Sequence, residues 1–298
     1  MKQNLRRELS LLIENASYFW RVTFLILKQS TYALITGGSL GIGKALALEC
    51  ARRGMDLLIV ALPDGELEKT VEEIKARFPV DVLGYGADLT DPVEVQQLAG
   101  FCLERQLPVS ILINNAGFGT GGLFENNSLK RYHSMQALNN RAMVDLCYLL
   151  LPVLKKHCPA FIMNTSSVEA TLPLPYKTVY TGTKSFIYSF SLALNEELRS
   201  SDISVSVLCP GPVVTNQEGL VRLNEYGWKG RLIAKMPDEV AAVAMKALLK
   251  RRRVIVPGRV NRLYIAILYW FPLGLKMRLL ERMFRVYRSH NMPAGSDT

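Results

Sequence analysis

From Tyr32 onward, the chain alternates short runs of apolar residues with longer segments in which apolar positions recur at helical spacing. The apolar runs predict β-strands within residues 32–36, 55–62, 80–89, 109–117, 160–167, 203–211 and 253–258. The periodic segments predict helices over residues 44–54, 65–78, 91–104, 128–156, 179–200 and 237–250. The chain therefore consists of a repeated strand–helix unit.

The predicted strands are apolar along their whole length, which indicates a sheet covered on both faces. Such strands alternating with helices are typical of a parallel sheet, and right-handed crossovers then give a doubly wound α/β fold of the Rossmann type. We expect a single domain over residues 31–258, with a substrate lid at about 212–236. Two helical appendages flank it, an amphipathic extension over 1–30 and a basic, apolar segment over 259–298.

The N-terminal extension lacks the patterns of a signal peptide and of a spanning helix. Glu14 and Arg21 interrupt its apolar stretch, whereas a signal peptide needs an uninterrupted one. The apolar run 22–27 is far shorter than the roughly 20 residues that a spanning helix needs. We expect an additional amphipathic helix that packs on the main domain or on a membrane surface.

The net charge of +10 is concentrated near the C-terminus. Residues 246–290 contain twelve lysines and arginines and one acid, Glu281, so the rest of the chain is close to neutral. An attraction to anionic surfaces therefore belongs to this segment and not to the whole protein. The charge alone would also suit nucleic acid, but no recognition motif accompanies it, and we expect no nucleic-acid partner.

The C-terminal segment combines an aromatic and aliphatic run, broken by Pro272, with an arginine-rich helix. The helical spacing sets Arg278, Arg282 and Arg285 against the apolar Leu279 and Met283. Three roles stay open for this segment: it lies on an anionic membrane surface, it contacts a partner subunit, or it closes a substrate cleft.

The cysteines and histidines do not form a predicted metal site. Five cysteines are scattered without metal-ligand spacing, and the three histidines are far apart in the sequence. An odd, dispersed set of cysteines fits buried thiols in a reducing compartment. We therefore expect no metal and a cytoplasmic protein, with peripheral membrane contact as the alternative that the basic C-terminus raises.

A glycine-rich turn follows the first predicted strand and opens a helix. In "TGGSLGIG", Gly37 permits the turn, while Gly41 and Gly43 let backbone N–H groups and the helix dipole approach a pyrophosphate. An ordinary turn is the alternative, since turns use glycine for other reasons. The strand before and the helix after favour a dinucleotide site.

"YTGTK" sets Tyr180 and Lys184 four positions apart, so that both side chains leave the same face of a helix. A lysine ammonium beside a phenol favours the phenolate, and we expect it to lower the pKa of Tyr180 from about 10. A tyrosine so tuned can exchange a proton with a carbonyl oxygen. The alternative is a surface helix with a solvated lysine.

Four motifs in order, "TGGSLGIG", "NNAG", the serine of "NTSS" and "YTGTK", resemble the short-chain dehydrogenase/reductase family over about residues 31–258. The stretch "TGTKSFIYSFSLALNEEL" is most similar to the branch of 17β-hydroxysteroid dehydrogenases and very-long-chain 3-oxoacyl reductases. The resemblance implies an NAD(P)-dependent oxidoreductase that transfers a hydride between nicotinamide and a carbonyl or alcohol.

The resemblance also assigns roles to individual residues. Ser167, preferred over Ser166 because it lies thirteen residues before Tyr180, would hydrogen-bond the substrate oxygen. Asn139 would steady a water-linked proton relay to Lys184, with the adjacent Asn140 as the alternative. The implied cofactor contacts are Gly37, Ser39, Gly41, Ile42, Gly43, Asp88, Leu89, Asn115, Ala116, Gly117, Tyr180, Lys184, Pro210, Gly211, Val213 and Thr215.

The residues that distinguish the two nicotinamide cofactors are both absent. The acid that receives the ribose hydroxyls of NAD falls on Ala61, and the basic residue that pairs with the phosphate of NADP falls on Leu62. A missing acid removes repulsion of that phosphate, so NADP(H) is favoured over NAD(H).

The segments expected around the nicotinamide are rich in apolar residues, which favours a bulky lipophilic ketone or alcohol, such as a steroid or a 3-oxoacyl group. These residues are Phe118, Leu123, Phe124, Leu172, Leu174, Leu220, Leu223, Tyr226, Trp228 and Ile233. Packing of a lid against the domain explains them equally well.

A second class of function is a cofactor-sensing regulator or scaffold with this fold and without the chemistry. Such a protein would be expected to lose the tyrosine or the lysine, and this chain has both. From the resemblance we also expect a homodimer or homotetramer.

Overall fold

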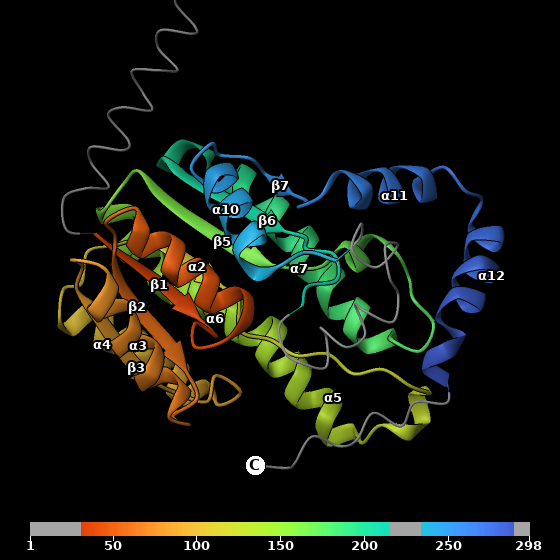
Figure 1. Cartoon of the computed structure of the whole chain (residues 1–298), viewed down its shortest axis with the longest axis horizontal. Coiled ribbons are helices and arrows are strands. Elements are labelled where there is room, and N and C mark those ends of the chain that lie inside the picture. Colours follow the sequence, from red (N-terminus) through yellow and green to blue (C-terminus); the bar gives the residue numbers. More distant parts are fainter. Residues whose placement is uncertain (1–30, 215–233, 289–298) are drawn as a thin grey trace, which may run out of the picture.

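The computed structural model describes residues 31–214 and 234–288, and a parallel sheet of seven strands runs through its centre (Figure 1). The strands are β1 (Tyr32–Thr36), β2 (Asp56–Ala61), β3 (Val82–Gly86), β4 (Val109–Asn114), β5 (Ala160–Thr165), β6 (Ile203–Leu208) and β7 (Val254–Ile255). Their order across the sheet is β3-β2-β1-β4-β5-β6-β7, with every neighbouring pair parallel. The winding direction reverses between β1 and β4, which is where doubly wound folds bind ligands.

Helices connect the strands as the sequence pattern predicts. They are α2 (Gly41–Arg52), α3 (Glu66–Arg77), α4 (Pro92–Glu104), α5 (Leu129–Gln136), α6 (Ala142–Lys156), α7 (Thr178–Glu197) and α10 (Pro237–Leu248). Asp91 caps α4 by accepting a hydrogen bond from the Val93 amide at 2.8 Å, and Pro92 occupies the first helical position. The doubly wound α/β fold is confirmed.

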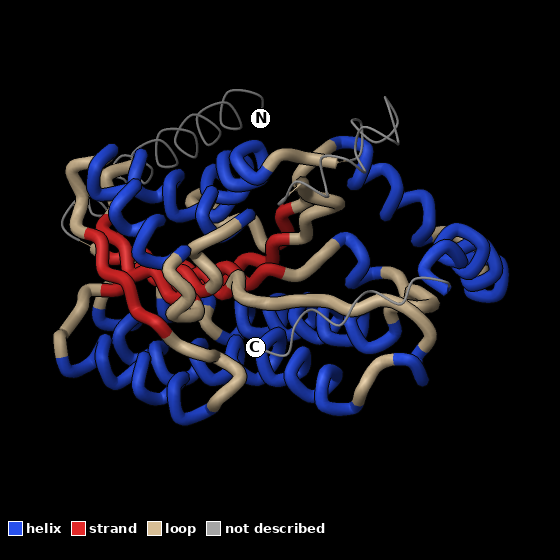
Figure 2. Tube along the Cα trace, turned by 60° about the horizontal axis from the view of Figure 1, so that its bottom comes forward, coloured by secondary structure: helices blue, strands red, loops and turns tan. Residues whose placement is uncertain are grey.

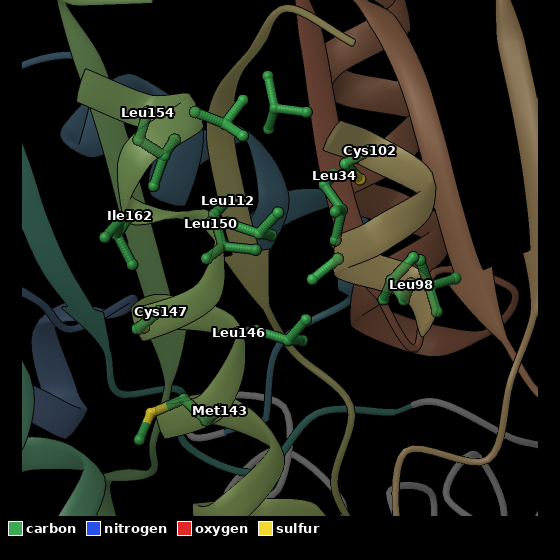
Figure 3. Packing of buried hydrophobic residues seen from close by; sticks show 14 of the residues in the cluster. Leu34, Leu98, Cys102, Leu112, Met143, Leu146, Cys147, Leu150, Leu154 and Ile162 are labelled. Carbon is green, nitrogen blue, oxygen red and sulfur yellow. The ribbon is translucent and has the colours of Figure 1, made fainter. Parts of the chain in front are cut away.

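Helices cover both faces of the sheet (Figure 2). Leu46 of α2, Ile74 of α3 and Val240 of α10 belong to one apolar core, on one face. The other face is covered by α4, α6 and α7, and Figure 3 shows Leu98 and Leu146 from this layer packed toward strand residues. Strands whose side chains are buried in both directions explain the uniformly apolar runs in the sequence.

The predicted helix over 128–156 contains an irregularity that the sequence pattern does not reveal. Between α5 and α6, a π-helical segment η2 (Ala137–Arg141) continues the same helix with one wider turn. Such segments often occur at functional sites. Here the wider turn carries Asn139, one of the predicted catalytic residues.

The C-terminal segment forms two helices, α11 (Arg259–Tyr269) and α12 (Leu273–Phe284), at the far end of the molecule from β3 (Figure 1). Leu280 is fully buried and forms a small core with Leu172 and Leu174. Leu279 and Met283, which the sequence sets against the arginines, are exposed instead. Helix α12 therefore docks through a different face from the one that the arginine spacing indicates.

The two ends of the predicted lid are joined. Val213 and Lys235 form a parallel bridge, and the Val214 amide donates to the Lys235 carbonyl at 3.1 Å. The residues between 214 and 234, which include Thr215 and most of the lid, and the N-terminal extension lie outside the described residues. No helix in the described part of the chain is both long and apolar enough to span a bilayer.

Candidate active site

The predicted site residues meet at one edge of the sheet, where the strands end. The glycine turn follows β1, Asp88 follows β3, Asn115 follows β4, Ser167 follows β5 and Pro210 follows β6. Tyr180 and Lys184 reach this edge from α7, and Asn139 reaches it from η2. Ligands of doubly wound folds bind at this edge.

The glycine turn has the geometry of a phosphate cradle. Gly37 has a φ of +62°, and a Cβ on Gly43 would lie 1.9 Å from the Gly37 carbonyl oxygen, so neither position accepts a side chain readily. The N-cap of α2 is Leu40, which makes no side-chain capping bond. The uncapped helix terminus can therefore donate its N–H groups to an anion, and the turn fits a dinucleotide pyrophosphate.

Thr36, which the sequence analysis did not single out, joins this turn to the segment after β4. Its hydroxyl oxygen accepts from the amides of Asn115 and Ala116, at 3.0 Å each. The Asn115 side chain donates to the Gly37 carbonyl at 3.2 Å. These bonds fix the glycine turn and the segment after β4 relative to each other.

Asp88 stands exposed at the end of β3. Its carboxylate accepts from the Thr90 amide at 2.8 Å, while Leu89 beside it is buried. Asp91 and not Asp88 caps the following helix. The carboxylate of Asp88 therefore keeps acceptor capacity for a ligand at this edge.

Ser167 lies beside the phenol of Tyr180, and its side chain lowers the pKa of that phenol. Ser167 begins the 3-10 helix η3 (Val168–Thr171), where its hydroxyl oxygen also accepts from the Glu169 amide at 3.1 Å. Ser166 instead donates to the Lys184 carbonyl at 2.7 Å and serves the backbone of α7. Of the two serines, Ser167 is therefore the one that acts on the phenol, and its role in catalysis stays a prediction.

Lys184 is buried beneath the tyrosine. Its ammonium donates to the Thr165 carbonyl at 3.0 Å and lies 5.8 Å from the centre of the Tyr180 ring. A Cβ on Gly117 would lie 3.6 Å from the same ammonium and 2.7 Å from the Asn139 side-chain oxygen. The segment after β4 therefore passes closely over Lys184 and Asn139.

Asn139 is almost fully buried and uses both ends of its amide. Its oxygen accepts from the Phe118 amide at 3.1 Å, and its nitrogen donates to the Phe118 carbonyl and to the Thr183 hydroxyl, at 3.0 Å each. Asn140 only donates to the Thr183 carbonyl, at 2.9 Å. Asn139 therefore connects the segment above Lys184 to α7, the helix that carries Tyr180 and Lys184.

The electrostatics of the pair differ from the sequence expectation. Burial raises the pKa of Tyr180, the Glu169 carboxylate raises it further, and the bond to Ser167 lowers it. Burial lowers the pKa of Lys184 to about 8. The expectation of a lowered pKa for Tyr180 is therefore wrong for this structure, because desolvation of the buried phenol is the largest influence on that pKa.

An ion pair beside the phenol was missed by the sequence analysis. Lys177 binds the Glu169 carboxylate at 2.8 Å, and its ammonium lies 5.9 Å from the Tyr180 ring and 4.8 Å from the Tyr287 ring. A Cβ on Gly121 would lie 3.2 Å from the Tyr287 ring. One signal existed in the sequence: Lys177 lies a helical turn before Tyr180, and Glu169 lies two residues after Ser167.

The segment after β6 is held by the C-terminal helix. A Cβ on Gly211 would lie 2.4 Å from the side chain of Asn261 on α11, and Asn261 donates to the Pro257 carbonyl at 3.0 Å. The Val168 amide donates to the Pro210 carbonyl at 3.0 Å. Gly211, which the resemblance places near the cofactor, is thus in contact with Asn261, a residue outside the predicted domain.

Several predicted pocket residues have other contacts. Leu172 and Leu174 are buried against α12, and Phe124 stacks on Tyr132 with a centroid distance of 5.3 Å. Residues 220, 223, 226, 228 and 233 lie outside the described part. The C-terminal appendage contributes Tyr287, whose ring lies near the same Lys177 ammonium as the Tyr180 ring.

A family model described as short chain dehydrogenase matches residues 31–225. The chain is 28% identical over 233 residues to a very-long-chain 3-oxoacyl-CoA reductase of Bos taurus, covering 73% of this chain and 68% of the relative. It is 30% identical over 195 residues to a 17-beta-hydroxysteroid dehydrogenase type 3 of Danio rerio, covering 63% and 62%. The matched region thus leaves about a third or more of each relative unmatched.

Solved structures agree with the fold. A short chain dehydrogenase/reductase from Burkholderia phymatum in complex with NAD superposes with a TM-score of 0.72 at 25% identity, covering 82% of this chain and 94% of that chain. An L-sorbose reductase from Gluconobacter frateurii complexed with NADPH and L-sorbose gives 0.68 at 26% identity, covering 77% and 96%.

Proposed function

The chain belongs to the short-chain dehydrogenase/reductase family and is an NAD(P)-dependent oxidoreductase, and from this premise we propose that it interconverts a bulky lipophilic ketone and its secondary alcohol. The observation that carries the proposal is the pair of Ser167 and Tyr180, which lies close to a buried Lys184 whose ammonium is 5.8 Å from the centre of the phenol ring. The pair lies at the same edge of the sheet as the glycine turn.

The chemistry follows from these groups. When bound, the nicotinamide supplies or accepts the hydride. Tyr180 donates its proton to the carbonyl oxygen in reduction and takes it back in oxidation, while the Ser167 hydroxyl hydrogen-bonds the same oxygen. Lys184 reaches the floor of the site through Thr165, and Asn139 holds the segment that passes over it.

The lipophilic substrate class is supported by two observations. The relatives are named for acyl-CoA and steroid substrates. In this chain, the ring of Tyr287 lies near the ammonium of Lys177, which in turn lies near the Tyr180 ring, so aromatic surface stands beside the reacting position. A steroid-like or 3-oxoacyl substrate would use such a wall.

We further propose a preference for NADP(H). Ala61 is buried at the end of β2 and Leu62 is exposed, so no carboxylate stands at either position to repel a ribose phosphate. Dissociation constants for NADPH and NADH, measured side by side by fluorescence titration, test the preference; a lower constant for NADH would reverse it.

The decisive assay is NADPH oxidation with a panel of lipophilic ketones, comparing the native protein with Tyr180→Phe. We expect turnover to fall at least about a hundredfold, because general acid catalysis contributes that much. Thermal unfolding at the temperature of the native protein shows that the variant is folded. If the native protein binds NADPH but turns over no ketone, and the variant behaves identically, the protein is a cofactor-binding regulator or scaffold and not an enzyme.

We also propose a homo-oligomer that forms through α6 and α7. A hollow of about 890 Å³ lies between η2, α6 and α7, lined by residues such as Asn140, Val144 and Phe186. Tyr148 of α6 and Phe186 of α7 expose large apolar side chains. Light scattering of Tyr148→Glu tests the contact: the mass should fall to that of a monomer.

A further inference from the structure

The two C-terminal helices each carry a stripe of exposed apolar side chains. On α11 the stripe consists of Val260, Leu263 and Ile267 and continues to Trp270, with exposed fractions between 42% and 84%. On α12 it consists of Leu275, Leu279, Met283 and Val286, with exposed fractions between 37% and 54%. Steps of three and four residues put each set on a single helix face.

The exposed stripe of α12 does not hold this helix on the domain. Helix α12 docks through Leu280, which is fully buried with Leu172 and Leu174, and through Phe284 beside it. The exposed stripe of α12 is therefore a second apolar face. Exposed apolar surface of this extent usually marks a site of interaction.

The charges beside the stripes select the kind of partner. Residues 259–288 contain seven lysines and arginines and one acid, Glu281, which is bound to Arg285 at 2.7 Å. Arg262, Arg278 and Arg282 are exposed next to the stripes. The partner surface must therefore be apolar and negatively charged. A second copy of the same face would instead bring like charges together across a two-fold axis.

The length of the helices determines how such a surface would be contacted. Helix α11 has 11 residues, a length of about 16 Å, which is about half the hydrocarbon thickness of a bilayer. Both helices must therefore lie along the membrane surface and not across it. Trp270, the most exposed of the apolar side chains, stands between them and has the residue type enriched at membrane interfaces.

We propose that α11 and α12 lie on an anionic lipid bilayer, with their exposed apolar stripes inserted at the level of the headgroups and the flanking arginines bound to lipid phosphates. The inference is independent of the proposed substrate. It needs only the described C-terminal helices and the docking of α12 through Leu280.

Co-sedimentation of the full chain with vesicles tests the proposal. We expect at least about tenfold tighter binding to equimolar phosphatidylglycerol and phosphatidylcholine than to phosphatidylcholine alone, and weaker binding at high salt. Ile267→Glu combined with Trp270→Glu should weaken binding to the anionic vesicles by about tenfold or more. Leu103→Glu is the matched control, because Leu103 of α4 has the same 50% exposure as Ile267, and it should bind like the native chain.

Three results would overturn the proposal. The first is that the native chain stays in the supernatant with anionic vesicles. The second is that the Ile267→Glu, Trp270→Glu variant sediments like the native chain, which moves any membrane contact to another part of the protein. The third is that, without lipid, the native chain is an oligomer and the variant is a monomer. The stripes would then be a contact between copies of the chain. Thermal unfolding of both variants establishes that they are folded.

Discussion

Around the phenol of Tyr180, neighbouring groups act on its acidity in opposite directions. Burial and the Glu169 carboxylate raise its pKa, and the hydrogen bond with Ser167 lowers it. A raised pKa keeps the phenol protonated, as the reduction of a ketone requires, whereas alcohol oxidation requires the phenolate. Glu169 and its partner Lys177 therefore set the pH range of the oxidative direction.

Replacement of Glu169 tests this assignment. Glu169→Gln removes a negative charge near the phenol, so the pKa of Tyr180 falls and the pH profile of alcohol oxidation should reach its plateau at lower pH. Lys177→Met leaves the carboxylate without its cation at 2.8 Å and should shift the plateau to higher pH. Profiles of kcat/KM against pH measure both shifts, and two shifts of the same sign would contradict the assignment.

A second prediction concerns the pH dependence of stability and follows from the buried ammonium of Lys184. Its folded-state pKa of about 8 lies below its ordinary 10.5, so between these values the unfolded chain binds more protons and stability rises with pH. Below pH 8 the penalty is fully present and amounts to roughly 3 kcal/mol. Lys184→Met lacks this penalty.

Urea unfolding of Lys184→Met and of the native chain, in parallel from pH 7 to pH 10.5, measures that penalty. The difference in unfolding free energy between the two should change in favour of the native chain as the pH rises. A constant difference over this range would mean that Lys184 is not desolvated in the folded protein.

At this scale, residue spacing indicates which side chains lie close together better than it indicates their pKa values. The interval of thirteen residues selected Ser167 over Ser166, and in the structure Ser167 influences the pKa of Tyr180 while the Ser166 hydroxyl donates to the Lys184 carbonyl. Glu169 was not found, because its nearness to Tyr180 depends on the turn of η3. Spacing also carries no measure of burial, which is the largest influence on the pKa of Tyr180.

Among the elements, the π-helical segment η2 has the clearest consequence for the site. Asn139 there makes three hydrogen bonds, two of them with the backbone of Phe118, whereas Asn140 makes one, with the carbonyl of Thr183. Hydrophobic periodicity predicted one regular helix, since a single wider turn hardly alters the order of apolar positions. The sequence could therefore locate the asparagine pair but not show which member faces Lys184.

Alanine substitutions distinguish the two asparagines. Asn139→Ala leaves both backbone groups of Phe118 without this partner in a buried site, so we expect a loss of about 1–3 kcal/mol in unfolding free energy and a lower kcat. Asn140→Ala removes one bond and should have the smaller effect in both measurements. Equal losses in the two variants would show that the buried role has been assigned wrongly to Asn139.

The turn between β1 and α2 is a second element whose geometry can be tested. A Cβ at Gly43 would meet the Gly37 carbonyl oxygen at 1.9 Å, so Gly43→Ala should destabilise the fold by roughly 1–3 kcal/mol and weaken NADPH binding. Gly100, inside α4, has nothing within 4 Å of its added Cβ. Gly100→Ala should therefore stabilise the protein by about 0.5–1 kcal/mol and leave NADPH binding unchanged. Thermal unfolding and fluorescence titration of both variants check this contrast.

At the scale of the whole molecule, the C-terminal helices pack against segments that lie at the candidate site. Asn261 fills the space beside Gly211, and Leu280 covers Leu172 and Leu174, which lie between Ser167 and Tyr180 in the chain. The sequence left the role of this segment open because the apolar residues of α12 fall on two stripes. Only the position of Leu172 and Leu174 decides which stripe is buried.

Loosening α12 should affect substrate and cofactor differently. Leu280→Ala opens a cavity under the helix, and we expect KM for a lipophilic ketone to rise by about tenfold while the dissociation constant for NADPH stays the same, since the glycine turn is remote from α12. Leu279→Ala, next to it on the exposed face, should change neither value in lipid-free buffer. A parallel loss of NADPH binding in Leu280→Ala would show general unfolding instead.

Helix α12 turns one stripe toward the segment that leads to Tyr180 and the other outward. If both are used at once, a ketone dissolved among lipids reaches the catalytic edge by lateral diffusion, without crossing the aqueous phase. The turnover rate would then follow the mole fraction of ketone in the vesicles. Diluting the suspension with buffer would leave that rate unchanged, whereas adding ketone-free lipid would lower it.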